Sequence, residues 1–68
     1  MKKYRYIIDN LRNEHIKPIT NGLKVINTIK SISVYPEENY IEILAKKNPE
    51  KHVESLCEFL YLSIRTKY

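Results

Sequence analysis

Three lysines have the clearest potential for chemistry in this sequence. Lys46, Lys47 and Lys51 surround residues 48–50, Asn-Pro-Glu, which are typical of a helix start. Because the helix macrodipole is positive at this end, cations there lower helix stability, whereas the free backbone amides favour phosphate. The cluster therefore predicts a site for an anion, with nucleic-acid phosphate favoured. A simple contribution to solubility is the alternative.

The charge of the whole chain agrees with an anionic partner. Its 68 residues include 12 Lys and Arg against 8 Asp and Glu, which gives a net charge of +4. A basic balance suits nucleic acid or another anionic surface. Further basic residues would extend this field from the N-terminal segment: Lys2, Lys3, Arg5 and Arg12. We therefore expect a small binding protein, with nucleic-acid backbone binding narrowly favoured over a protein-binding regulator or inhibitor.

No other pattern predicts a catalytic centre, a metal site or a cofactor. His52 and Cys57 lie five positions apart in the sequence, which is about 140° around a helix, so they cannot share a metal ion. His15 falls on the core face of the predicted first helix, where a partly buried, hydrogen-bonded role is expected. The sequence has neither a Ser-His-acid arrangement nor a glycine-rich phosphate loop. We therefore expect no enzymatic activity.

The N-terminal segment predicts a helix over about residues 3–15. Its apolar face follows helical spacing through Tyr4, Ile7, Ile8, Leu11 and His15. Tyr4, Tyr6 and Ile8 also alternate as a short strand would, but the helical pattern is longer. Pro18 then ends the helix at or before the preceding residue.

Asn21-Gly22 favours a type I′ hairpin, because both central positions of that turn need a positive φ. It predicts short strands on either side, and Pro18 would confine the first of them to an edge. A short helix over about residues 23–29 is the alternative.

A second hairpin is better defined, with a four-residue turn over residues 36–39. The turn would pair Tyr35 with Tyr40, Val34 with Ile41, Ser33 with Glu42, and Ile32 with Ile43. The two members of each pair agree in polarity, so a shift of one residue would destroy the match. The apolar phase changes before this hairpin, which predicts a bulge or break between about residues 27 and 31.

A last helix is predicted within residues 46–68. Its apolar stripe follows helical spacing through Val53, Leu56, Cys57, Leu60, Tyr61 and Ile64. Phe59 and Leu62 lie away from the centre of this stripe, so we expect the pair to form an exposed ridge.

Two pairs of side chains are candidate partner contacts. Tyr35 and Tyr40 lie on the solvent-exposed face of the predicted hairpin, where they could stack on bases or anchor a protein contact. Phe59 and Leu62 could hold a partner or a second copy of the chain. The candidate partners are thus nucleic acid, a protein, and a second copy that binds through the last helix.

These elements predict an α+β fold in one domain over residues 1–68. The expected architecture is a two-layer sandwich in the order α-β-β-β-α, with both helices on one face of a three-stranded antiparallel sheet.

This layout resembles the double-stranded RNA-binding domain. Lys46, Lys47 and Lys51 partly match the lysines that open that family's last helix, although the family's glycines are missing. The layout is also similar to that of some small phage-encoded inhibitors of CRISPR nucleases. Those inhibitors often imitate DNA with acidic surfaces, whereas this chain is basic.

The remaining features favour a soluble protein of the cytoplasm. The first residues are charged and contain no long apolar run before Asp9, so they predict neither a signal peptide nor a membrane span. A single cysteine, Cys57, excludes an internal disulfide framework and fits a reducing compartment.

Overall fold

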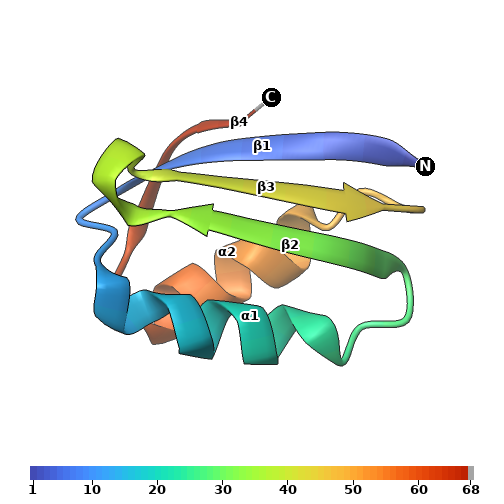
Figure 1. Cartoon of the computed structure of the whole chain (residues 1–68), viewed down its shortest axis with the longest axis horizontal. Helices are drawn as coiled ribbons and strands as arrows, with labels where there is room; N and C mark the ends of the chain where they lie inside the picture. Colours follow the sequence, from blue (N-terminus) through green and yellow to red (C-terminus); the bar gives the residue numbers. More distant parts are fainter. Residues whose placement is uncertain (68) are drawn as a thin grey trace.

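The computed structural model describes residues 1–67, which form one sheet and two helices. In chain order the elements are β1 (Lys2–Asp9), the 3-10 turn η1 (Asn13–His15), α1 (Ile16–Lys24), β2 (Ile29–Tyr35), the 3-10 turn η2 (Pro36–Glu38), β3 (Tyr40–Ala45), α2 (Glu50–Phe59) and β4 (Ser63–Lys67). The strands pair antiparallel in the order β2-β3-β1-β4, and both helices cover the same face (Figure 1). The α+β class and the two helices on one face are confirmed. The three-stranded sheet and the order α-β-β-β-α are wrong.

The first segment is the central strand β1, not the predicted helix. Tyr6 and Ile8 point into the core and are only 1% and 0% exposed. They lie opposite Ile41 of β3 and Ile64 of β4, respectively. Aromatic and β-branched residues that alternate between faces favour a strand when neighbours can pair on both sides. These pairings are made with distant segments, and they override the local helical spacing.

The second hairpin has the predicted register. Tyr35 lies opposite Tyr40, and the match continues through Ile32 opposite Ile43. The turn is closed by Asn39, whose φ of 53° lies in the left-handed region that asparagine tolerates. The expected break is also confirmed, because the register shifts between Ile29 and Ser31.

The predicted Asn21-Gly22 turn is wrong, because both residues lie inside α1. The alternative helix over residues 23–29 is also wrong, since α1 ends at Lys24. Ile19 and Leu23 are four residues apart and each is 1% exposed, so one face of α1 is anchored in the core. Gly22 is therefore not part of a turn.

The last helix begins at Glu50 as predicted but is shorter than expected. It ends at Phe59, and Tyr61, with a φ of 60°, turns the chain into β4. Leu62 is therefore 8% exposed and belongs to the core, so its predicted place on an exposed ridge is wrong. Phe59 is 76% exposed, as expected. Within residues 1–67, neither helix has the length and apolar character needed to cross a membrane.

Candidate functional site

The predicted lysine cluster lies at the start of α2. Lys46, Lys47 and Lys51 are all exposed. The helix start is already capped, because the Asn48 side-chain oxygen accepts a hydrogen bond from the Glu50 amide at 2.9 Å. The lysines are therefore accessible, but one of the amide groups expected to attract an anion already has a partner within the chain.

The other predicted basic residues extend this cluster only in part, because Lys2 lies opposite Ala45, the residue before Lys46. Lys2, Lys3 and Arg5 lie on β1 and not on a helix, whereas Arg12 follows the far end of that strand. Lys3 and Arg5 both approach the Glu42 carboxylate, at N–O distances of 3.7 and 3.6 Å. Part of the predicted positive field is thus offset by an acidic neighbour on β3.

Both helices cover one face of the sheet and leave the other open (Figure 1). Ile41 and Ile43 of β3 are buried on the covered face, so Tyr40, which alternates with them, lies on the open face with its stacking partner Tyr35. The rings of Tyr35 and Tyr40 stack with centroids 5.6 Å apart and an interplanar angle of 22°. Ile7 of β1 lies opposite Tyr40 on its other side. We call Ile7, Tyr35 and Tyr40, together with the neighbouring Arg5 and Glu42, the tyrosine face.

Hydrogen bonds and charges hold the tyrosine face in place. The Tyr40 hydroxyl donates to Glu42 Oε2 at 3.0 Å, and the same carboxylate oxygen lies 3.6 Å from Arg5 Nε. Burial raises the pKa of Tyr40, and the hydrogen bond to the Glu42 carboxylate raises it further. The Tyr40 ring is therefore fixed both by stacking and through its hydroxyl.

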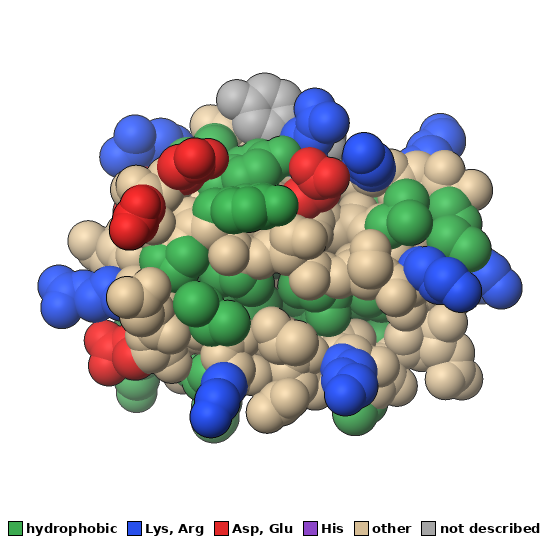
Figure 2. Space-filling view, viewed as in Figure 1, with side chains coloured by type: hydrophobic (Ala, Val, Ile, Leu, Met, Phe, Trp, Pro, Cys, Tyr) green, Lys and Arg blue, Asp and Glu red, His purple; other side chains and the backbone are tan. Residues whose placement is uncertain are grey.

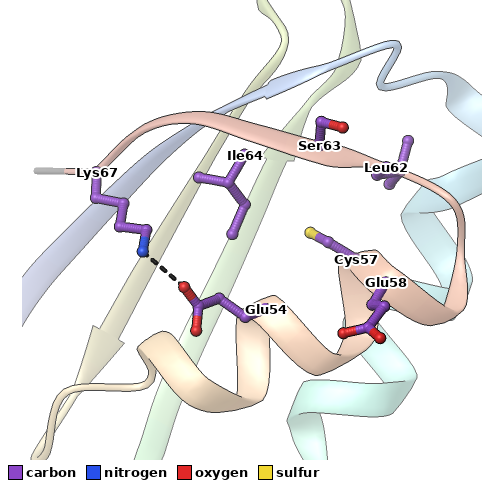
Figure 3. Close-up of a pocket in the computed structure, with 7 residues that line it drawn as sticks. All are labelled: Glu54, Cys57, Glu58, Leu62, Ser63, Ile64 and Lys67. Atoms are coloured by element: carbon purple, nitrogen blue, oxygen red, sulfur yellow. Dashed lines mark hydrogen bonds and ion pairs between the residues drawn. The ribbon is translucent and has the colours of Figure 1, made fainter.

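A groove of about 460 Å³ lies between α2 and β4 (Figure 3). Its lining residues are Glu54, Cys57, Glu58, Leu62, Ser63, Ile64 and Lys67. The Lys67 ammonium bridges two carboxylates, at 2.6 Å from Glu54 and 3.4 Å from Glu50. Burial raises the pKa of the Cys57 thiol to about 11, so this cysteine is a neutral thiol at physiological pH. A neutral, buried thiol is a poor nucleophile.

The described residues do not fit a metal centre. Residues 1–67 contain no group of three or more His, Cys, Asp or Glu side chains that could hold a metal ion. Cys57 is the single cysteine of the sequence, and it is buried. His15 is half-buried, and its Nδ1 accepts a hydrogen bond from the Arg12 amide at 3.0 Å, as expected, but it lies in the turn η1 and not on the core face of a first helix.

Sequence reasoning identified the tyrosine pair but missed the β1 residues beside it. Ile7 and Arg5 were assigned to a helix, which would have separated them from Tyr40. The alternation of Tyr4, Tyr6 and Ile8 was the available signal. In a strand with this alternation, Arg5 and Ile7 lie together on the face opposite that of Tyr4, Tyr6 and Ile8.

Comparison with known proteins yields matches in structure alone. No protein-family model matches the sequence, and a search of curated proteins found no match. The N-terminal domain of ZntA, solved in solution in its Zn(II) form, superposes with a TM-score of 0.79 at 14% identity, covering 93% of this chain and 88% of that one. The apo heavy-metal-associated (HMA) domain of the copper chaperone for superoxide dismutase superposes with a TM-score of 0.67 at 9% identity, covering 94% of this chain and 66% of that one. The chain therefore has the ferredoxin-like fold of HMA domains.

The fold overturns the nucleic-acid prediction and the alternative of a phage-type inhibitor. The nucleic-acid prediction rested on the lysine cluster and the basic charge, and the layout that resembled both families, α-β-β-β-α, is not the one that the chain has. The two solved structures compared above are instead metal-binding-type domains, the N-terminal domain of ZntA and an HMA domain. The helix that was to carry Lys3 and Arg5 beside the lysine cluster is the strand β1, where both residues lie against Glu42.

Proposed function

We propose that this chain is a non-catalytic protein-binding module on the HMA-domain fold, and that the tyrosine face is its recognition surface. The observation that carries the proposal is the stacked pair of Tyr35 and Tyr40. Alternation with the buried Ile41 puts Tyr40 on the face of the sheet opposite the helices. Tyrosine combines a broad apolar ring with a polar tip, and it is enriched at protein interfaces.

The tyrosine face is arranged as an anchor that needs little ordering on binding. Stacking and the hydrogen bond to Glu42 restrict the Tyr40 ring before any partner arrives. A side chain that is already ordered loses less conformational entropy in a complex. Arg5 and Lys3 are 50% and 60% exposed and lie beside this carboxylate, so they supply the charged rim that interfaces commonly have.

Two further observations support a protein partner that is bound without a resident metal. One of the structural neighbours belongs to the copper chaperone for superoxide dismutase, whose name includes a second protein. The neighbours' names also include zinc and copper, but residues 1–67 of this chain offer no suitable group of ligands. The proposed role of the fold in this chain is therefore protein contact.

Site-specific photocrosslinking tests the proposal. A photoreactive phenylalanine analogue placed at Tyr40 of the full chain should crosslink a discrete protein in cells of the source organism. The same analogue at Phe59, an exposed position on α2, is the matched control. Excess wild-type chain should compete with the Tyr40 crosslink, and a Tyr35→Ala competitor should do so at least 10-fold less well. Equal crosslinking from positions 40 and 59, or equal competition by both chains, would overturn the proposal.

Calorimetric titration with Zn(II) tests the metal-free part of the proposal separately. We expect no stoichiometric binding by the wild-type chain. Tight binding at one ion per chain would show that the described residues form a ligand group after all, whatever the crosslinking result.

A further inference from the structure

The sheet has two free edges, β2 and β4, and they are built differently. Strand β4 is five residues long, and its pairing with β1 is interrupted by a register shift between Ile7 and Ile8. It also carries the charged side chains of Arg65 and Lys67. Short length, irregular register and charge are features that discourage an edge strand from pairing with another chain.

The part of β2 after Lys30 lacks these protections. After the register shift at Ile29, residues 31–35 run in regular register with β3 and carry no charged side chain. Ile32 and Val34 lie on the core side of the sheet but remain partly exposed at this edge. Figure 1 shows β2 as the near edge of the sheet beside α1, with no further strand in front of it. A regular, uncharged edge of this kind is a template for strand addition.

The two ends of the β2 edge carry opposite charges. A hollow of about 240 Å³ beside the start of β2 is lined in part by Lys24 and Lys30. A second hollow, of about 190 Å³, beside its end is lined in part by Glu37 and Glu38. Figure 2 shows hydrophobic side chains in a band across this face, with most of the acidic side chains in view toward the η2 end. Among the described residues, none of these four side chains forms an ion pair.

We propose that the chain forms a homodimer by antiparallel pairing of β2 with β2 of a second copy, which joins the two sheets into one. A two-fold axis at Ser33 places Ser31 opposite Tyr35 and Ile32 opposite Val34 of the second copy. Residues opposite each other then lie on the same side of the joined sheet, as antiparallel pairing requires. The partly exposed Ile32 and Val34 cover each other across the axis.

The charges identify a second copy as the occupant of this edge. In the antiparallel arrangement, the Lys24 and Lys30 end of each copy meets the Glu37 and Glu38 end of the other. A two-fold interface must be complementary to itself, and an edge with opposite charges at its two ends meets that condition. A uniformly basic or acidic segment would be attracted at one end and repelled at the other. The proposal does not depend on the proposed function, and within the tyrosine face it involves only Tyr35, which lies on β2.

Sedimentation equilibrium of the full chain over a wide concentration range tests the proposal. We expect a reversible monomer–dimer equilibrium for the wild type. Ser33→Lys places two like charges at the two-fold axis and should abolish the dimer, whereas Ser63→Lys on β4 should leave it intact. Circular dichroism establishes that each variant is folded. A wild type that stays monomeric at millimolar concentration, or a folded Ser33→Lys variant that dimerises normally, would overturn the proposal.

A charge exchange provides a second test that does not depend on Ser33. Lys30→Glu alone and Glu37→Lys alone should each weaken the dimer by roughly 3- to 30-fold, because every dimer contains two copies of the affected exposed contact. The double variant Lys30→Glu/Glu37→Lys should recover most of the wild-type affinity. Additive weakening in the double variant would show that the two ends do not meet, and would exclude this pairing.

Discussion

Gly22 of α1 and Leu56 of α2 lie so close that a Cβ atom at position 22 would stand 3.1 Å from Leu56 Cδ1. The missing side chain at Gly22 therefore sets the distance between the two helices. This explains why Asn21-Gly22, a strong turn signal in isolation, occurs inside a helix. The glycine gives close packing at a cost in helix propensity of about 1 kcal/mol relative to alanine.

The first prediction concerns this helix contact. Gly22→Ala should change the free energy of unfolding by less than about 1 kcal/mol, because the gain in helix propensity offsets a small shift of the flexible Leu56 side chain. Gly22→Ile should destabilise by about 1–3 kcal/mol through overpacking. Urea denaturation would measure both effects.

Coupling between the two positions provides the control. Leu56→Ala should cost less in the Gly22→Ile background than in the wild type, because it makes room for the larger residue. Strictly additive effects of the two substitutions would show that these side chains do not compete for the same space.

The second prediction concerns stability at high pH. Burial raises the pKa of Tyr6 from 10.0 to about 12, with a smaller contribution from Glu50, and it raises that of Cys57 from 9.0 to about 11. In the unfolded chain both groups lose their protons at the ordinary values. The folded state then holds more protons than the unfolded state, so the free energy of unfolding falls as the pH rises through this range.

The two groups should contribute in different parts of the range. Cys57→Ala should flatten the loss of stability between about pH 9 and 11, and Tyr6→Phe should flatten it between about pH 10 and 12. Stability below pH 9 should not depend on the ionisation of either group. Denaturation curves at closely spaced pH values would show these slopes. A wild-type curve without any decline above pH 9 would contradict the prediction.

The third prediction contrasts neighbouring residues on β3. Ile41 is 1% exposed and faces the helices, whereas Glu42 faces the open side. Ile41→Asp should unfold the chain, because burying a carboxylate costs several kcal/mol, comparable with the whole stability of about 5 kcal/mol expected for a small domain. Glu42→Lys should cost only about 1 kcal/mol, through lost exposed contacts to Lys3 and Arg5. Thermal melts would test this, and the reverse ranking would show that the register is wrong.

The hairpin of β2 and β3 could be predicted because its information is local. Each pair from Tyr35–Tyr40 to Ile32–Ile43 matches in polarity, and the turn leaves one workable register. The start of α2 was also found from local signals, since Asn48 caps it directly. The tyrosine pair followed from the same hairpin, so part of the candidate site was predicted with it.

Strands β1 and β4 could not be predicted because they pair with segments that are distant in sequence. Ile8 and Ile64 lie opposite each other although most of the chain separates them, and neither has a local partner that would indicate a strand. In both segments the few apolar residues fit the spacing of a helix as well as they fit the two-residue alternation of a strand. The contribution of β1 to the tyrosine face was missed for the same reason.

The last prediction distinguishes β4 from a continued helix. Leu62 is 8% exposed in the structure, whereas Phe59 is 76% exposed; a helix that continued past residue 60 would expose both. Leu62→Ala should destabilise by about 2–4 kcal/mol because it leaves a cavity in the core. Phe59→Ala should stay within about 0.5 kcal/mol of the wild type, as expected of an exposed position. Urea denaturation of the two variants would decide between these arrangements. If both substitutions were equally mild, Leu62 would not be buried against α2, and the path of the chain after Tyr61 would have to be redrawn.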